Sequence, residues 1–86
     1  MALSDRDRRI IDLERGWWRE PGTKEHAIRR DPGLSSSRYY ALLGPLCDTD
    51  EARAYDPLVA IRVRRLRAAR RRARIEGRSA GGPITR

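Results

Sequence analysis

The sequence contains one cysteine, one histidine, one methionine and no phenylalanine among its 86 residues. A single cysteine, Cys47, excludes an internal disulfide framework and a zinc site built from a cysteine cluster. No apolar run approaches the roughly 18 residues that a membrane span needs. The N-terminus is acidic and Arg-rich and lacks the apolar segment of a signal peptide. We therefore expect a cytoplasmic protein that does not associate with membranes.

Apolar residues are also scarce: the hydrophobic set makes up 38% of the chain and the charged set 37%. A chain this short buries only about 60% of the surface that its unfolded form exposes, so the core must be thin. The sequence shows no nucleophile paired with a base, no Gly-rich phosphate loop and no metal-ligand spacing. We expect no catalytic residues, no cofactor and no metal, and hence a protein that is not an enzyme.

Positive charge is concentrated at one end of the chain. Residues 1–56 contain 10 bases and 11 acids, a net charge of −1, whereas residues 57–86 contain 10 arginines and the single acid Glu76, a net charge of +9. Of the 20 basic residues, only Lys24 is a lysine. Arginine favours bidentate contacts with phosphate or carboxylate. This asymmetry is typical of a protein with a polyanionic partner, most often nucleic acid.

Signals at helix ends predict an all-α fold, because no segment alternates with the period of a strand. Ser4, Thr23 and Ser35 are suited to N-cap positions, and Asp56 followed by Pro57 is a strong helix start. Pro45 leaves open whether the third helix stops or only kinks. The predicted helices span residues 5–19, 24–30, 35–43 (or as far as 47), a short turn through 55, and 57–76, where Gly77 marks the end.

We thus expect a small four- or five-helix domain over residues 1–76, followed by a disordered tail over 77–86. The apolar positions recur at helical spacing, and one of the two adjacent tryptophans should enter the core. Cys47 should be a small buried side chain. The positions predicted to face inward are Ile10, Ile11, Leu13, Trp17, Ala27, Ile28, Tyr39, Leu42, Leu43, Leu46, Leu58, Ile61 and Leu66, with Val59 and Val63 beside the last three.

Residues 23–43 have the pattern of a helix-turn-helix, in which the second helix enters the DNA major groove. Ile28 lies late in the first helix, Gly33 supplies the positive φ of the turn, and Tyr39 and Leu42 anchor the second helix. Short polar side chains at its start would let the backbone approach the base edges. The predicted base-reading residues are Ser35, Ser36, Ser37, Arg38, Tyr40 and Ala41.

Two positions depart from this pattern. Arg29 stands where a small residue is usual between the two helices, and Pro32 is uncommon in the turn. Short helices around a Pro-Gly turn are frequent in small α-helical domains. A purely structural helical corner therefore stays open as the alternative.

The segment 62–74 contains eight arginines in 13 residues, which would surround a helix with positive charge. Each phosphate that they neutralise adds affinity by counterion release but no sequence information. The alternative is a solvated helix face. The predicted phosphate-binding residues are Lys24, Arg62, Arg64, Arg65, Arg67, Arg70, Arg71, Arg72 and Arg74.

Three stretches together resemble a family of short actinobacterial proteins known only as a domain of unknown function. They lie near the start, in the middle and at the end of the chain, over residues 3–74. Their most specific marks are Trp17-Trp18 and Arg38-Tyr39-Tyr40. The relatives carry a more helical pair where this chain has Asp31-Pro32, which implies a tighter turn here. The resemblance implies a cytoplasmic, high-GC bacterial setting compatible with DNA-binding regulators, and no established activity.

The sequence therefore predicts a small transcriptional regulator or nucleoid-associated protein that binds double-stranded DNA in preference to RNA. One alternative is an RNA-binding or ribosome-associated protein in which the Arg-rich helix docks on folded RNA. Another is an interaction module in which Trp18 and Tyr40 contact a partner in the transcription machinery. Many helix-turn-helix proteins bind DNA as homodimers, although no separate dimerisation helix is evident here.

Overall fold

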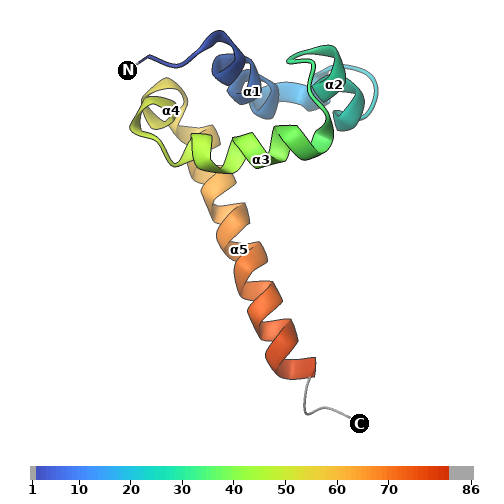
Figure 1. Cartoon of the computed structure of the whole chain (residues 1–86), viewed down its shortest axis with the longest axis vertical. Helices are drawn as coiled ribbons and strands as arrows, with labels where there is room; N and C mark the ends of the chain where they lie inside the picture. The colour runs from blue at the N-terminus through green and yellow to red at the C-terminus, as the bar shows by residue number, and fades with distance from the viewer. Residues whose placement is uncertain (1, 82–86) are drawn as a thin grey trace.

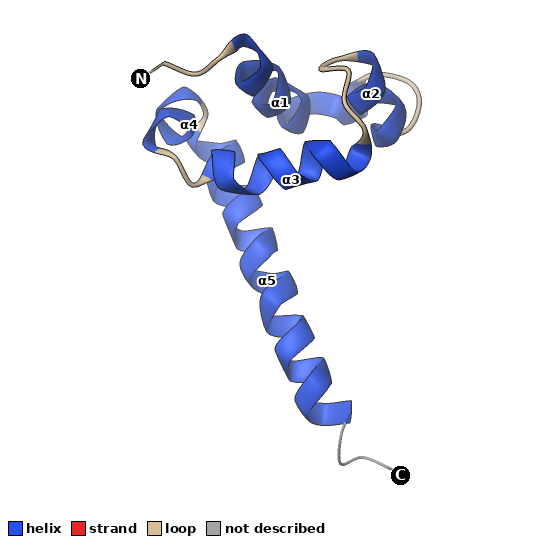
Figure 2. Cartoon of the chain, in the orientation of Figure 1, coloured by secondary structure: helices blue, strands red, loops and turns tan. Residues whose placement is uncertain are grey.

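The computed structural model describes residues 2–81, the last four of them by their backbone alone. These residues form an all-α fold without a strand (Figure 2). Five α-helices and one short 3-10 helix follow one another with brief connections (Figure 1). The elements are α1 (Asp5–Gly16), η1 (Trp17–Arg19), α2 (Lys24–Arg30), α3 (Ser36–Cys47), α4 (Asp50–Tyr55) and α5 (Pro57–Gly81).

The predicted helix starts are confirmed by their capping hydrogen bonds. Ser4, Thr23 and Ser35 each accept a hydrogen bond from the backbone N–H three residues later, at 3.0–3.1 Å. Asp56 does the same for the N–H of Val59 at 3.2 Å and also accepts from Arg15 Nε at 2.6 Å. These side chains satisfy backbone donors that have no partner within the helix.

The turn between α2 and α3 also forms as predicted. Gly33 has φ of +82°, in the left-handed region that glycine adopts without steric cost. The backbone N–H groups of Gly33 and Leu34 both donate to the carbonyl of Ile28, at 2.9 and 3.1 Å. Residues 24–47 are therefore a helix, a tight turn and a second helix. This arrangement is a helical corner. Its geometry alone does not assign it a role in DNA binding.

The structure decides one helix end that the sequence left open, and it corrects another. The third helix does not stop at Leu43 but takes the longer of its two predicted lengths, through Pro45 to Cys47, because Leu46 and Cys47 pack into the core and outweigh the hydrogen bond that proline cannot make. The last helix passes Gly77, the predicted stop, and runs to Gly81. One glycine costs a helix only about 1 kcal/mol relative to alanine, and Gly77 does not adopt the left-handed φ of a helix stop. Of the predicted tail, residues 82–86 lie outside the described residues.

The core contains side chains from α1 to α5 and agrees with the prediction over the first three helices except at the tryptophans, where the prediction that one of them enters the core is wrong. Cys47 is fully buried, as expected. Neither tryptophan is buried: Trp17 is half-buried at the end of α1 and Trp18 is 52% exposed. The buried cluster consists of Ile10, Ile11, Ile28, Tyr39, Leu43, Leu46, Cys47, Ala52, Val59, Ala60 and Val63.

The inward face of α5 differs from the prediction. Val59, Ala60 and Val63 are the residues that pack into the core, whereas Leu58 and Ile61 are 78% and 42% exposed. Both sets fit the helical period, so spacing alone could not separate them. Small Ala60 lets α5 come close to the helices on which it packs. Leu66, also predicted to face inward, is exposed.

Only the first part of α5 has neighbours in the body of the protein. It packs against α1, α3 and α4, and then projects away on the side of α3 opposite α1 and α2 (Figure 1). The molecule is accordingly elongated, with extents of 50 × 30 × 21 Å. Helices α3 and α5 thus form an L. We call the arginine-rich part of α5, residues 65–74, its free limb.

A buried carboxylate lies where four helices meet. Glu14 of α1 is 5% exposed, and its Oε2 is 2.7 Å from the Tyr39 hydroxyl and 2.7 Å from Lys24 Nζ. The Tyr39 hydroxyl is also 3.3 Å from the Ile10 carbonyl oxygen, and Arg62 of α5 donates to the Glu14 carbonyl oxygen. Burial and the Glu14 charge raise the pKa of Tyr39, so its hydroxyl stays protonated and donates.

We expect Tyr39→Phe to lower the free energy of unfolding by about 1–3 kcal/mol, because Glu14 would lose a buried donor. The matched control is Tyr40→Phe at the next position, since the Tyr40 hydroxyl has no hydrogen-bond partner within the described residues. Urea unfolding followed by circular dichroism measures both. Equal losses in the two variants would show that the bond to Glu14 contributes nothing particular.

Burial, followed by the nearby Glu14 charge, raises the pKa of the Cys47 thiol from 9.0 to about 11. A folded-state pKa above the unfolded value means that the stability from the protonated thiol is complete below pH 9 and is lost as the pH rises through 11. We expect slow labelling of native Cys47 by a thiol reagent at pH 8, and fast labelling in urea. Between pH 9 and 11, Cys47→Ala should lose less stability than the unaltered protein, and an equal loss would contradict the assignment.

Candidate nucleic-acid interface

The projecting part of α5 carries arginines without partners. Within the described residues, Arg65, Arg70, Arg71, Arg72 and Arg74 make no hydrogen bond and no ion pair, and all five side chains are exposed. At 100° per residue they point in several directions around the helix. The only acid on α5 is Glu76. This limb therefore presents a cationic surface that the body of the protein does not neutralise.

Three other predicted phosphate-binding arginines are held by the body. Arg62 donates to Glu14 and lies 5.6 Å from the centroid of the Trp18 ring. Arg64 Nε and an Arg67 amino group lie 3.5 and 3.0 Å from the two carboxylate oxygens of Asp48. These contacts engage the arginines of α5 closest to α3 and offset part of their charge.

Lys24 is likewise occupied. Its ammonium group forms the ion pair with Glu14 and lies 5.0 Å from the ring centroid of Tyr40, 5.8 Å from that of Tyr39 and 5.9 Å from that of Trp17. A cation beside a carboxylate and close to aromatic rings is held in place by both kinds of contact. The structure thus divides the predicted phosphate-binding set into four engaged residues and five free arginines.

The predicted base-reading residues are also divided. Ser37, Arg38 and Ala41 are exposed on one face at the start of α3, whereas Ser36 is half-buried and the Ser35 hydroxyl accepts from the Arg38 backbone N–H at 3.1 Å.

Tyr40 does not share the outer face of Arg38 but turns towards α5. Its ring meets that of Tyr39 edge to face, with centroids 5.1 Å apart. The outer face of α3 is accordingly smaller than predicted.

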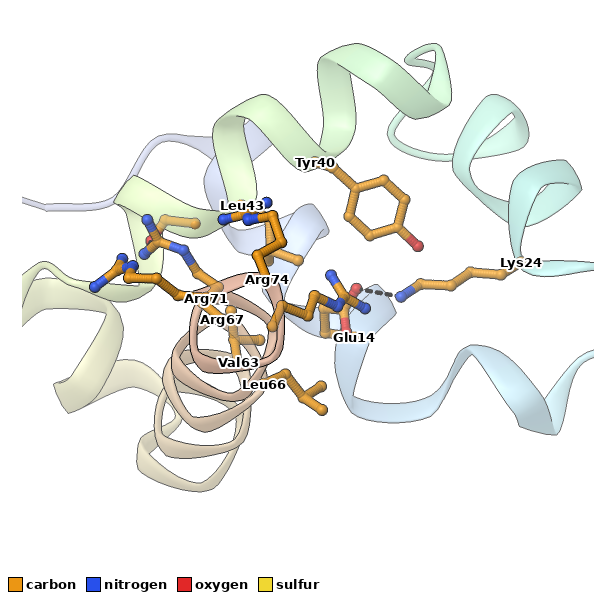
Figure 3. A pocket seen from close by; sticks show the side chains of 11 residues that line it. Glu14, Lys24, Tyr40, Leu43, Val63, Leu66, Arg67, Arg71 and Arg74 are labelled. Carbon is orange, nitrogen blue, oxygen red and sulfur yellow. Dashed lines mark hydrogen bonds and ion pairs between the residues drawn. The ribbon is translucent and has the colours of Figure 1, made fainter. Parts of the chain in front are cut away.

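A cleft of about 310 Å³ lies in the corner of the L, between α3 and α5. Figure 3 shows Tyr40 and Lys24 reaching towards it from α3 and α2, opposite the arginines of α5. Its lining residues are Glu14, Lys24, Tyr40, Leu43, Gly44, Val63, Leu66, Arg67, Arg70, Arg71 and Arg74.

Sequence reasoning did not find this cleft, because it depends on how two helices cross. One signal was present: Gly44 lies inside a predicted helix, and a residue without a Cβ allows another segment to approach closely. A Cβ at Gly44 would lie 2.9 Å from the Arg67 guanidinium, and Arg67 donates to the Gly44 carbonyl at 3.0 Å.

Other kinds of site find no support in the part of the chain that the structure describes. None of its helices is both long enough and apolar enough to cross a membrane. Its His, Cys, Asp and Glu side chains form no group of three or more that could hold a metal ion.

A family model matches residues 2–75, which include α1 to α4 and most of α5. Its description is "Protein of unknown function (DUF3263)". The chain belongs to the DUF3263 family. Searches of curated proteins and of solved structures find no match. Membership in DUF3263 agrees with the resemblance seen in the sequence and assigns no activity, so the function must be argued from the residues.

We expect Asp48→Asn in this DUF3263 protein to strengthen its retention on heparin, because the substitution removes the negative charge that Arg64 and Arg67 share. The control is Asp50→Asn, which changes the net charge equally but frees only Arg53 on α4. Asp48→Asn should elute at a higher salt concentration than Asp50→Asn, with little change in stability, since exposed ion pairs contribute about 0–1 kcal/mol. Co-elution of the two variants would show that Arg64 and Arg67 do not belong to the cationic surface.

Proposed function

We propose that this protein binds double-stranded DNA, as a small transcriptional regulator or nucleoid-type protein. The observation that carries the proposal is the group of five exposed arginines on α5 without partners in the described chain. Guanidinium groups bind phosphate oxygens in a bidentate geometry. In this proposal α5 contacts the DNA backbone, and the outer face of α3 contacts base edges in the major groove.

The arrangement of the helices supports contact with one ligand on two sides. The free limb of α5 leaves the body on the side of α3 that faces away from α1 and α2 (Figure 1). At 1.5 Å per residue, the nine steps from Arg65 to Arg74 span about 14 Å. A duplex carries one phosphate charge per 1.7 Å of its axis with both strands counted, so a segment of this length carries about eight phosphates. A duplex segment of the length of the limb therefore carries more phosphates than the limb has free arginines.

The start of α3 has the side chains that a major-groove contact needs. Ser37 and Ala41 are short and let the backbone approach the bases, and Arg38 has two donors for the O6 and N7 atoms of guanine. The Arg38 side chain is exposed and makes no hydrogen bond and no ion pair within the described residues, so its guanidinium is free for a contact. Within the proposal, Arg38 carries sequence preference and the α5 arginines carry affinity.

The first test is selection from a pool of random-sequence duplexes, with structured RNA as competitor, over a range of salt concentrations. We expect a recurring sequence motif whose binding persists at salt concentrations that abolish non-specific binding. Sequence-blind binding that fades steeply with salt would confine the interaction to α5 and leave α3 a structural corner. Preferential retention of the RNA would overturn the DNA proposal in favour of an RNA-binding protein.

Substitutions separate the two surfaces. Arg38→Ala should relax the selected motif, whereas replacing Arg70, Arg71 and Arg72 by alanine should weaken binding to all duplexes alike. Each lost phosphate contact reduces the slope of log affinity against log salt by about 0.9. The control replaces Arg6, Arg9 and Arg53, which lose the same charge but are already ion-paired with Asp7, Asp31 and Asp50. Equal losses from both triple variants would reduce the role of α5 to net charge.

A further inference from the structure

The cleft between α3 and α5 combines an aromatic wall, an apolar floor and an excess of positive charge. The wall is the ring of Tyr40, which is 43% exposed and fixed by its contacts with Tyr39 and Lys24. Tyr39 itself is fully buried and bonded to Glu14. A half-exposed aromatic ring on a rigid support is a surface on which another ring can stack.

The floor of the cleft is apolar. Leu43 and Val63 line it and are each at most 5% exposed, and Leu66 continues it as an exposed apolar side chain. Phosphate alone gains nothing from such a floor, whereas a planar organic ring beside Tyr40 buries apolar area against it. The volume of about 310 Å³ is at the lower end of the range of small-molecule sites. A small organic group is therefore a suitable occupant.

The charges of the cleft leave an excess of cations. Glu14 is paired with Lys24, and Arg67 is paired with Asp48. Arg70, Arg71 and Arg74 line the same cleft and have no partner within the described residues. A purely apolar ligand would leave these three charges unused, so the occupant should carry negative charge next to its ring.

We propose that this cleft binds a nucleotide unit, with the base on Tyr40 and the apolar floor and the phosphates on Arg70, Arg71 and Arg74. Two sources offer this chemistry: a free nucleotide and an unpaired base in a single strand. Bases stacked inside a duplex cannot lie on Tyr40, so the site goes beyond the proposed duplex binding. It shares arginines with that surface but uses no residue of the outer face of α3.

The test is calorimetric titration of the full chain with ATP, adenosine and inorganic tripolyphosphate. We expect ATP to bind at least ten-fold more tightly than either part alone, because the ring and the phosphates use different walls of the cleft. Tripolyphosphate that binds as tightly as ATP would overturn the proposal, since charge alone would then account for binding. Failure of ATP to bind, together with failure of a single-stranded oligothymidine, would also overturn it.

Matched variants locate the site. Tyr40→Ala should lower ATP affinity about ten-fold through the loss of stacking, whereas Tyr40→Phe should retain it. Replacing both Arg70 and Arg74 by alanine should lower ATP affinity at least ten-fold. Replacing Arg65 and Arg72, which lie together beside Ile61 and Ala68 outside this cleft, should change it less than two-fold. Equal effects of the two arginine pairs on ATP would overturn the assignment of the cleft.

The same variants separate this inference from the proposed function. Duplex binding should weaken in both arginine pairs, whereas ATP binding should weaken only in the pair from the cleft. If the protein binds duplexes but neither ATP nor oligothymidine, the proposed function stands and this inference fails. If it binds ATP or oligothymidine but no duplex, this inference stands and the proposed function fails. Binding of ATP without oligothymidine identifies the free nucleotide as the source, and binding of oligothymidine without ATP identifies the single strand.

Discussion

The buried carboxylate of Glu14 connects four of the five α-helices. The carboxylate lies on α1, accepts a hydrogen bond from the Tyr39 hydroxyl of α3 and forms an ion pair with Lys24 of α2. The backbone carbonyl of Glu14 accepts a hydrogen bond from Arg62 of α5. A buried charge is costly unless it is paired and fully hydrogen-bonded. Removing any one donor therefore affects the packing of a different helix. In a domain with so thin a core, this polar contact fixes the relative positions of helices that few apolar side chains hold.

The same network determines which cations the protein can offer to a partner. Lys24 and Arg62 have a structural role, because they compensate the buried charge of Glu14. Asp48 has a similar effect one step further along α5, where it holds Arg64 and Arg67. The remaining five arginines form no ion pair with an acid of the body within the described residues. Which arginines are structural and which are available is therefore set by the positions of Glu14 and Asp48, and not by the arginine pattern itself.

Much of the fold could be predicted from the sequence, because local signals were strong. Each N-cap residue stands directly before its helix, and Tyr39 lies at the helical spacing that places it in the core. The inward face of α5 could not be predicted in the same way, since Leu58 and Ile61 fit the helical period as well as Val59 and Val63. Only the packing of α5 against α3 and α4 selects between these faces.

The candidate site was harder to predict because its residues are distant in the sequence. Lys24 and Glu14 are ten positions apart on different helices, and nothing local distinguishes a lysine paired with a buried carboxylate from one free to bind phosphate. Tyr40 was correctly predicted to be exposed, but which side it faces depends on the crossing of α3 and α5 at Gly44. The charge pattern of the sequence predicted the cationic helix. Which of its arginines are engaged and which are free depends on tertiary contacts.

The free limb of α5 also links folding to binding. Its arginines and alanines have high intrinsic helix propensity, but like charges at i, i+4, such as Arg67 with Arg71 and Arg70 with Arg74, repel one another. With no core beneath it, this part of the helix has little packing to offset that repulsion. A polyanion beside the limb would neutralise the arginines and remove the repulsion in the same step. Helix stability in the limb and affinity for a polyanion are therefore coupled, and each should increase with the other.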